Sequence, residues 1–182
     1  MKVQSEVTND KPSEYGFKLP VEGWHIVEFL EGIKQQVNED GTPKEDKKGN
    51  KSWLFPAKIS NDEDESNGIY LNQFITENDF GEHQIADFIA AVGQKENFEK
   101  AFPGDRSFFE SAIMDKIKIK LPGQFCKMRT ELETYEGKQR PKVKAVAGVK
   151  YVPKDDVKGK ADKKVKKEAA ASEPAKESGG GW

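Results

Sequence analysis

The stretch that decides the fold is Phe125-Cys126-Lys127-Met128-Arg129-Thr130-Glu131-Leu132-Glu133-Thr134-Tyr135, which alternates between two kinds of residue. One parity holds Cys126, Met128, Thr130 and Leu132, and the other holds Phe125, Lys127, Arg129, Glu131, Glu133 and Tyr135. Successive side chains of a β-strand point to opposite faces of the sheet. The stretch therefore predicts a strand with one buried face and one charged face, and Cys126 is expected in the core.

Strands are also predicted on both sides of this stretch. Before it, Lys116 to Leu121 alternates lysine with Ile117, Ile119 and Leu121, and Pro122-Gly123 turns the chain. After it, Glu136-Gly137-Lys138 predicts a hairpin turn. A last strand is then expected from about Lys142 to Tyr151, with Lys142 and Lys144 alternating against Val143 and Ala145.

Three further strands are predicted in the N-terminal half. Trp24 to Leu30 is rich in strand formers, and Lys51 to Ile59 forms the second strand, with Pro56 at an edge or bulge. Ile69 to Ile75 forms the third. Between the first two strands, residues 38–50 hold charged and turn-forming residues without an apolar anchor, so we expect a long, mobile hairpin loop there.

The middle of the chain follows a helical period. Thr76 precedes a capping-box pattern, and Ile85, Phe88, Ile89 and Val92 form one apolar stripe before Gly93, a natural helix end. A shorter helix is expected over Glu96 to Phe102, and Ser107 with Glu110 repeats the capping-box pattern. The helical section is therefore predicted to run from about Glu77 to Asp115.

This order of elements predicts the fold class and the domain organisation. Three strands, a helical insert and further strands favour a mainly β, α+β protein: an OB-fold-like small barrel with the helical insert between strands three and four. The domain is expected over residues 18–152, after a flexible arm over residues 1–17. Residues 153–182 have low complexity, which predicts a disordered C-terminal tail.

Charge is distributed unevenly along the 182 residues, although the formal net charge is only −2. Residues 1–115 hold 12 Lys/Arg against 23 Asp/Glu, a net charge of −11, whereas residues 116–150 hold 10 against 3, a net charge of +7. Such a separation favours one surface suited to a polyanion. The alternative is that the charges simply solubilise the surface.

The sequence offers few residues that could form a catalytic site, a metal site or a membrane-spanning segment. The two histidines, His25 and His83, have no metal-ligand spacing, and one cysteine permits neither an internal disulfide nor a multi-cysteine zinc site. We therefore expect no catalytic residues, no metal and no cofactor. Without a long apolar run or a signal peptide, the chain is expected to be soluble and cytoplasmic, and no membrane partner is expected.

The sequence is richer in residues that bind nucleic acids, because cations can hold phosphates while aromatic rings stack under bases. The predicted basic strands supply the cations Lys116, Lys118, Lys120, Lys127, Arg129, Lys138, Arg140, Lys142 and Lys144. Phe125 and Tyr135 share the charged parity, although they could instead pack beneath the helical insert. Trp24, Trp53, Phe55 and Tyr70 are weaker stacking candidates, of which at least half are expected in the core, and Lys48 lies in the long loop.

The order of these segments resembles phage-encoded single-stranded DNA-binding proteins of replication and recombination gene clusters. The matching positions are Gly23 and Trp24, Lys48 and Gly49, Ala91 and Gly93, and Tyr135, Gly137, Lys138, Arg140, Lys142 and Val143, spread over residues 18–151 in outline. The acidic run Asp62 to Glu65 and the stretch Glu96 to Asp115 are longer than the family pattern needs.

The resemblance implies a non-enzymatic protein that binds and protects single-stranded DNA, with little sequence specificity, in the cytoplasm of a phage-infected cell. It also implies recruitment of replication or recombination proteins through the C-terminal tail, where Trp182 is the candidate contact. The sequence leaves the oligomeric state open, a homo-oligomer included. The alternative function is an acidic protein-interaction module, or a DNA mimic, that binds a basic partner through residues 1–115.

Overall fold

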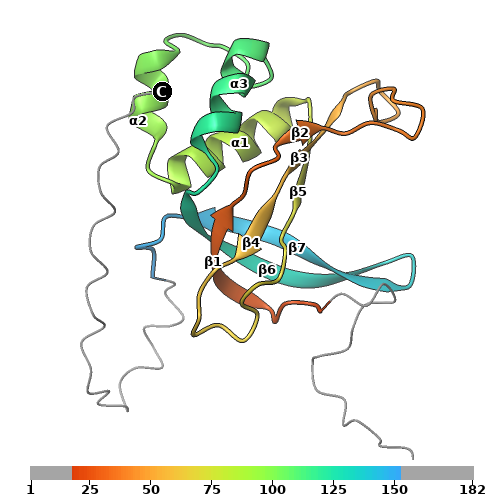
Figure 1. Ribbon diagram of the computed structural model, residues 1–182, viewed down its shortest axis with the longest axis vertical. Coiled ribbons are helices and arrows are strands. Elements are labelled where there is room, and N and C mark those ends of the chain that lie inside the picture. Colours follow the sequence, from red (N-terminus) through yellow and green to blue (C-terminus); the bar gives the residue numbers. More distant parts are fainter. Residues whose placement is uncertain (1–17, 153–182) are drawn as a thin grey trace, which may run out of the picture.

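A computed structural model describes residues 18–152, so the predicted arm over residues 1–17 and the predicted tail over residues 153–182 lie outside the described residues. The strands are β1 (Gly23–Phe29), β2 (Lys34–Gln35), β3 (Ser52–Phe55), β4 (Ala57–Ile59), β5 (Gln73–Thr76), β6 (Phe125–Tyr135) and β7 (Lys138–Ala147). The helices α1 (Asp79–Ala91), α2 (Lys95–Ala101) and α3 (Ser111–Lys120) follow β5 and precede β6 (Figure 1).

The strands form two antiparallel sheets. One sheet has the order β4-β1-β6-β7 and the other has the order β2-β3-β5. The predicted second strand passes from one sheet to the other at Pro56, which separates β3 from β4, as a residue without a backbone N–H permits. The result is a curled, half-barrel arrangement, so the prediction of a mainly β protein that also contains helices is confirmed.

The core lies between the curled sheets and the helices. Phe88 of α1 contacts Phe29 and Phe55, with ring centroids 5.1 and 6.1 Å apart. Ile85 and Ile89 are buried beside it, which confirms the predicted apolar stripe. The large apolar side chains of both sheets therefore pack against one face of α1.

The helix α1 begins two residues later than the sequence predicted. Its N-cap is Asn78, whose Oδ1 accepts a hydrogen bond from the Gly81 backbone N–H, rather than Thr76. A Cβ on Gly81 would lie 1.9 Å from the Thr76 carbonyl oxygen. Glycine therefore allows the first turn of α1 to pack directly on the end of β5. Gly93 follows α1 with a φ of 74°, which confirms the predicted helix end.

The predicted strand over Lys116 to Leu121 is wrong, because these residues belong to the end of α3 and its C-cap. Ile113, Ile117 and Leu121 are four residues apart and fully buried, whereas Ile119 is 70% exposed. Alternation over six residues fits both a strand and part of a helix. The apolar residues just before it extend the pattern at helical spacing, and the core accepts that helical face.

The hairpin of β6 and β7 is as predicted, with shifted bounds. Glu136 and Gly137 form the two-residue turn and have φ values of 50° and 76°, as a type I′ turn requires. The last strand begins at Lys138 and ends at Ala147, rather than running from Lys142 to Tyr151.

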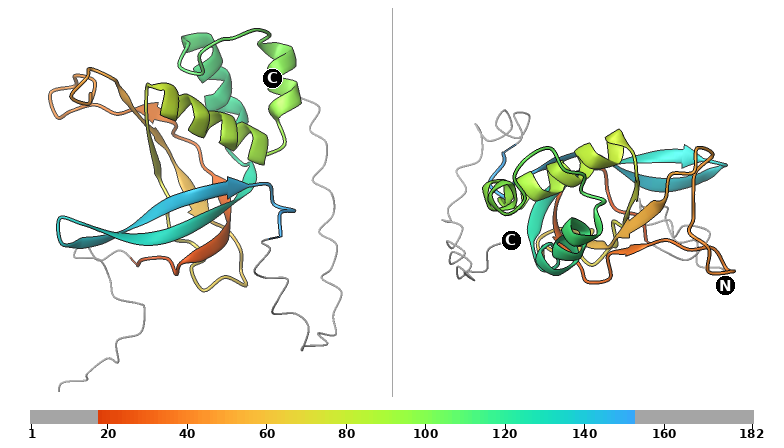
Figure 2. Two further views of the ribbon diagram at one scale, coloured as in Figure 1. Left: turned by 180° about the vertical axis from the view of Figure 1, so that it is seen from behind. Right: turned by 90° about the horizontal axis from the view of Figure 1, so that it is seen from above.

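Residues 38–50, the expected mobile loop, contain two hydrogen-bonded turns. The Asn38 N–H donates to the Thr42 carbonyl, and the Asp46 N–H donates to the Asn50 carbonyl. This loop and the β6–β7 turn project on the same side of the molecule, away from α2 (Figures 1 and 2).

Candidate nucleic-acid interface

The face of the four-stranded sheet that points away from the core carries most of the predicted site. On β6, Cys126, Met128 and Thr130 are buried, whereas Phe125 and Arg129 are exposed, so the predicted division of this strand between two faces is confirmed. Burial raises the pKa of the Cys126 thiol to about 12, which keeps it protonated and inert at neutral pH. Below, the outward face means the outward side of β1, β4, β6 and β7.

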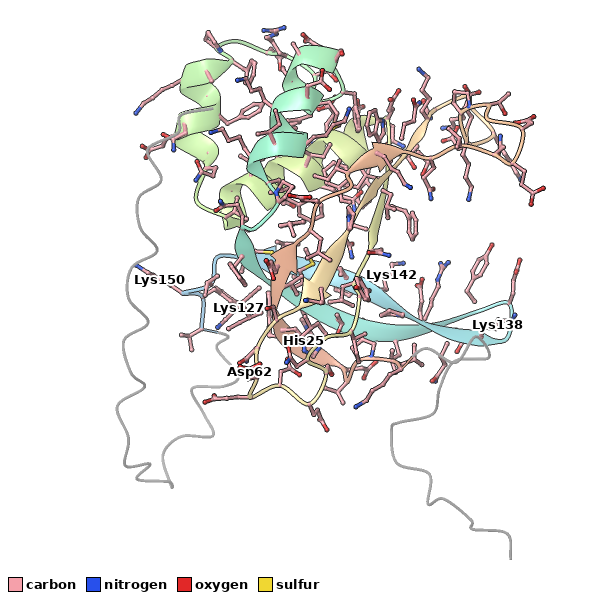
Figure 3. All side chains as sticks on the ribbon, in the orientation of Figure 1. His25, Asp62, Lys127, Lys138, Lys142 and Lys150 are labelled. Atoms are coloured by element: carbon pink, nitrogen blue, oxygen red, sulfur yellow. The ribbon has the colours of Figure 1, made fainter. Side chains whose placement is uncertain are left out.

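Strand register brings further side chains onto the outward face. Trp24 of β1 lies opposite Arg129 of β6. On β7, the partners of outward β6 residues are Lys142 opposite Glu131, Arg140 opposite Glu133 and Lys138 opposite Tyr135. The register shifts at Arg129 and Thr130, so Lys144 is the extra residue of a β-bulge beside Ala145. Figure 3 places Lys138 at the hairpin turn, Lys142 along β7 and Lys127 towards the far end of β6.

Two glutamates pair with most of these cations. Glu133 accepts from Arg140 at 2.8 Å and from Lys142 at 3.0 Å, and hydrogen bonds from Lys142 and Arg140 hold the pKa of its carboxyl below the ordinary value. Glu131 lies 3.5 Å from Arg129 and 3.8 Å from Lys144. Residues 125–147 nevertheless carry six Lys/Arg against three Glu, a net charge of +3. Because exposed ion pairs are weak, a phosphate can exchange with either carboxylate.

The aromatic rings of the outward face are accessible to different degrees. Phe125 is 43% exposed and Tyr135 is 53% exposed, so neither packs beneath the helices. The Arg140 guanidinium lies 4.2 Å from the centre of the Tyr135 ring, a cation–π contact that covers part of one ring face. Trp24 is half-buried and contacts Tyr151, with ring centroids 5.0 Å apart.

Five predicted site residues lie elsewhere. Lys116, Lys118 and Lys120 belong to α3, and Lys48 lies in the loop of residues 38–50. The Trp53 indole N–H donates to Glu77 Oε1 at 2.7 Å, and the ring packs against the core with the Lys118 ammonium 5.4 Å from its centre. Trp53 therefore joins β3 to the helices and is not available for stacking on the outward face.

Two exposed aromatic residues were undervalued or missed. Tyr70, one of the weaker stacking candidates, forms an isolated β-bridge with Lys58 of β4. Lys58 lies opposite Glu28 of β1, and Glu28 lies opposite Phe125 of β6. This row extends the outward face beyond β4 towards β5. Phe74, on the same parity as Tyr70, is also exposed and was not predicted. The alternation of Tyr70 and Phe74 with buried Leu71 and Ile75 is the sequence pattern that could have identified them.

His25 belongs to a buried polar cluster on the inner side of β1. Its Nδ1 lies 2.6 Å from Asp64 Oδ2, and its Nε2 lies 2.8 Å from the Val21 carbonyl and 3.0 Å from Thr130 Oγ1. The order Asp-His-Thr resembles a catalytic triad, but His25 and Thr130 are inaccessible to a substrate. The cluster instead fastens the acidic loop that carries Asp62 to β1 and β6 (Figure 3).

Within residues 18–152, no group of three or more His, Cys, Asp or Glu side chains is arranged to hold a metal ion. None of the helices in that part of the chain is both long enough and apolar enough to cross a bilayer.

The arrangement as a whole combines a cationic hairpin, exposed aromatic rings and a rigid sheet beneath them. Comparison with known proteins assigns neither a family nor a function to the chain: no family model matches it, and no curated protein is significantly similar to it.

Proposed function

We propose that this protein binds single-stranded DNA along the outward face, with little sequence specificity, and acts by binding rather than by catalysis. The observation that carries the proposal is the outward side of β6 and β7, where exposed Phe125 and Tyr135 stand among six cations. Single-strand binding without sequence preference needs this combination of a basic track and aromatic platforms.

The cations suit a phosphate backbone because they follow the two longest strands. Arg129, Lys142 and Lys144 are each about half exposed, and their present partners are the carboxylates of Glu131 and Glu133. A polyanion offers many phosphates and releases its counterions on binding, which favours exchange at low salt. The affinity is therefore expected to depend strongly on salt concentration.

The architecture supports the same ligand. We propose that the curled sheets are an OB-like barrel, in which the loop of residues 38–50 and the β6–β7 turn flank the binding surface, as the equivalent loops do in OB-folds. Both project on the same side of the molecule (Figures 1 and 2). Lys48 would then contribute from the loop, and Tyr70 and Phe74 would extend the surface onto β5.

The biological setting follows from the resemblance described above and belongs to the proposal. In this setting the protein coats single-stranded DNA during phage replication or recombination, in the cytoplasm of the host cell. Replication or recombination proteins would be recruited through the tail that ends in Trp182, which lies outside the described residues.

A charge-reversal pair tests the proposed surface. The variant Lys142→Glu/Lys144→Glu should lower the affinity for a fluorescein-labelled oligo-dT by at least about tenfold, because it removes two phosphate contacts and adds two repulsive charges. Fluorescence anisotropy at low salt measures the loss. The matched control is Lys95→Glu/Lys100→Glu on α2, which changes the net charge equally at two exposed positions away from the sheet.

Equal loss in both variants would mean that net charge alone governs the interaction, and unchanged affinity in the Lys142/Lys144 variant would contradict the proposed surface. The alternative function, an acidic interaction module, predicts that this variant keeps its binding to a basic partner.

A further inference from the structure

The chain places one of its own residues on the proposed DNA surface. Strand β7 ends at Ala147. Residues 148–151 then turn back across β6, so that the Tyr151 ring contacts Trp24 of β1. These four residues are called the Tyr151 strap below. Figure 3 labels Lys150 near Lys127, at the end of the sheet opposite the hairpin turn that carries Lys138.

Tyr151 makes two contacts that have the same chemistry as a bound nucleotide. Its ring lies on the Trp24 indole with centroids 5.0 Å apart and planes inclined by 50°, where a base could otherwise stack. Its carbonyl oxygen accepts a hydrogen bond from Lys127 Nζ at 2.7 Å, where a phosphate oxygen could otherwise accept one. One residue thus occupies a stacking position and a cation position at once.

The strap is attached lightly enough to be displaced. Tyr151 is 43% exposed, and Val149 and Val152 on either side of it are exposed as well. Its backbone N–H donates to Gly148, which only closes the turn itself. A segment with few buried contacts opens at low cost compared with the sheet beneath it.

We infer that Tyr151 is a displaceable internal occupant of one nucleotide position, so that single-stranded DNA and the strap compete for Trp24 and Lys127. The inference rests on the proposed function, which identifies the competing ligand. Displacement frees the indole face for a base and the Lys127 ammonium for a phosphate. The strap therefore lowers the apparent affinity for DNA, because only the molecules in which it is open can bind at this position.

The test is the direction in which Tyr151→Ala changes the affinity of the full chain for oligo-dT. Removing the ring exposes the Trp24 face in every molecule, although the backbone carbonyl of residue 151 can still accept from Lys127, so the affinity should rise by about three- to tenfold, as expected when a binding-competent state becomes more populated. Tyr151→Phe keeps the ring and should bind like the wild type. Val152→Ala, at the exposed neighbour, is the matched control and should also leave the affinity unchanged.

A spectroscopic readout follows Trp24 directly. In the chain labelled with 5-fluorotryptophan, the ¹⁹F resonance of Trp24, assigned with Trp24→Phe, should shift when Tyr151 is replaced by alanine in the free protein. In the wild type it should shift on addition of oligo-dT, because the ring then exchanges one partner for another.

The outcomes separate the inference from the proposed function. If the wild type binds oligo-dT and Tyr151→Ala binds equally or more weakly, Tyr151 is not a competitor and the inference fails while the proposed function stands. If neither protein binds oligo-dT at low salt, the proposed function fails and the inference fails with it.

Discussion

Two carboxylates, those of Glu131 and Glu133, limit how strongly the cations of the outward face can attract a phosphate. Glu133 holds Arg140 and Lys142, and Glu131 lies between Arg129 and Lys144, so a phosphate must displace a glutamate before it gains a full partner. Each pair is exposed and weak, but the carboxylates also repel the phosphates directly. At the residue scale, we therefore expect the affinity for DNA to be governed as much by two glutamates as by the cations around them.

Replacing Glu133 by glutamine should strengthen DNA binding. Glu133→Gln removes one negative charge and releases Arg140 and Lys142, so we expect a two- to fivefold rise in affinity for oligo-dT, about 0.4–1 kcal/mol. The slope of log affinity against log salt should steepen by about 0.7 for each further phosphate contact. Fluorescence anisotropy at several salt concentrations measures both quantities.

Glu96→Gln on α2 is the control, because it makes the same change of charge at an exposed position on a helix. The account of Glu133 is wrong if the two variants bind equally well, or if Glu133→Gln binds more weakly than the wild type.

The Cys126 thiol should be unreactive in the folded protein. Burial raises its pKa to about 12, and its side chain is inaccessible, so Ellman's reagent should react only after denaturant is added. The folded state keeps the thiol proton above pH 9.0, the ordinary value from which the pKa is raised, while the unfolded state loses it. Stability from this group is complete below that value and is lost towards pH 12, at up to about 1.4 kcal/mol per pH unit.

Urea unfolding at about pH 8 and about pH 10, for the wild type and for Cys126→Ala, isolates this effect from other titrating groups. The alanine variant should lose less stability over this interval. Fast reaction with Ellman's reagent without denaturant, or identical pH dependence in both proteins, would contradict the buried position.

At the scale of elements, the sequence predicts β6 well because its alternation spans eleven residues and places every charged side chain on one parity. The apolar stripe of α1 is predicted for the same reason. The strand predicted at Lys116 fails because six alternating residues are too few to distinguish the two periods, and packing of Ile113 and Ile117 into the core decides for a helix.

The candidate site also has one part that the sequence predicts and another part that it does not. Which β6 residues point outward follows from parity alone. The pairing of cations with Glu131 and Glu133, the inward direction of Trp53 and the return of Tyr151 depend on register and tertiary contacts. A single sequence does not encode these in a local pattern.

A contact between Asp64 and the buried His25 fastens the acidic loop between β4 and β5 to β1. Asp64 accepts from His25 through Oδ2 and from the Ser66 N–H through Oδ1. Asp64→Ala should lower the free energy of unfolding by about 2–3 kcal/mol, because it leaves Nδ1 of the buried His25 imidazole without its partner. Urea unfolding measures the loss.

Asp62→Ala in the same loop provides the comparison, since Asp62 is exposed and accepts only from Asn67 Nδ2 among the interactions described for residues 18–152. It should cost well under 1 kcal/mol, as is usual for surface substitutions. Equal losses in the two variants would show that the buried contact does not hold the loop.

At the scale of the whole molecule, the helices and the proposed binding face occupy different ends. The three helices lie together at one end, and the β6–β7 turn projects from the other part of the molecule (Figures 1 and 2). The net charge of +7 over residues 116–150 is therefore divided, because three of its ten cations lie on α3 and the others lie on the β6–β7 hairpin or in the strap. The central claim is that the hairpin carries the DNA-binding activity.

That claim is tested most directly by titrating the full chain with fluorescein-labelled oligo-dT at low and high salt, followed by anisotropy and by tryptophan fluorescence. We expect saturable binding that quenches the fluorescence of Trp24, with log affinity falling linearly as log salt rises, by about 0.7 per phosphate contact. No change in either anisotropy or fluorescence at low salt would contradict it.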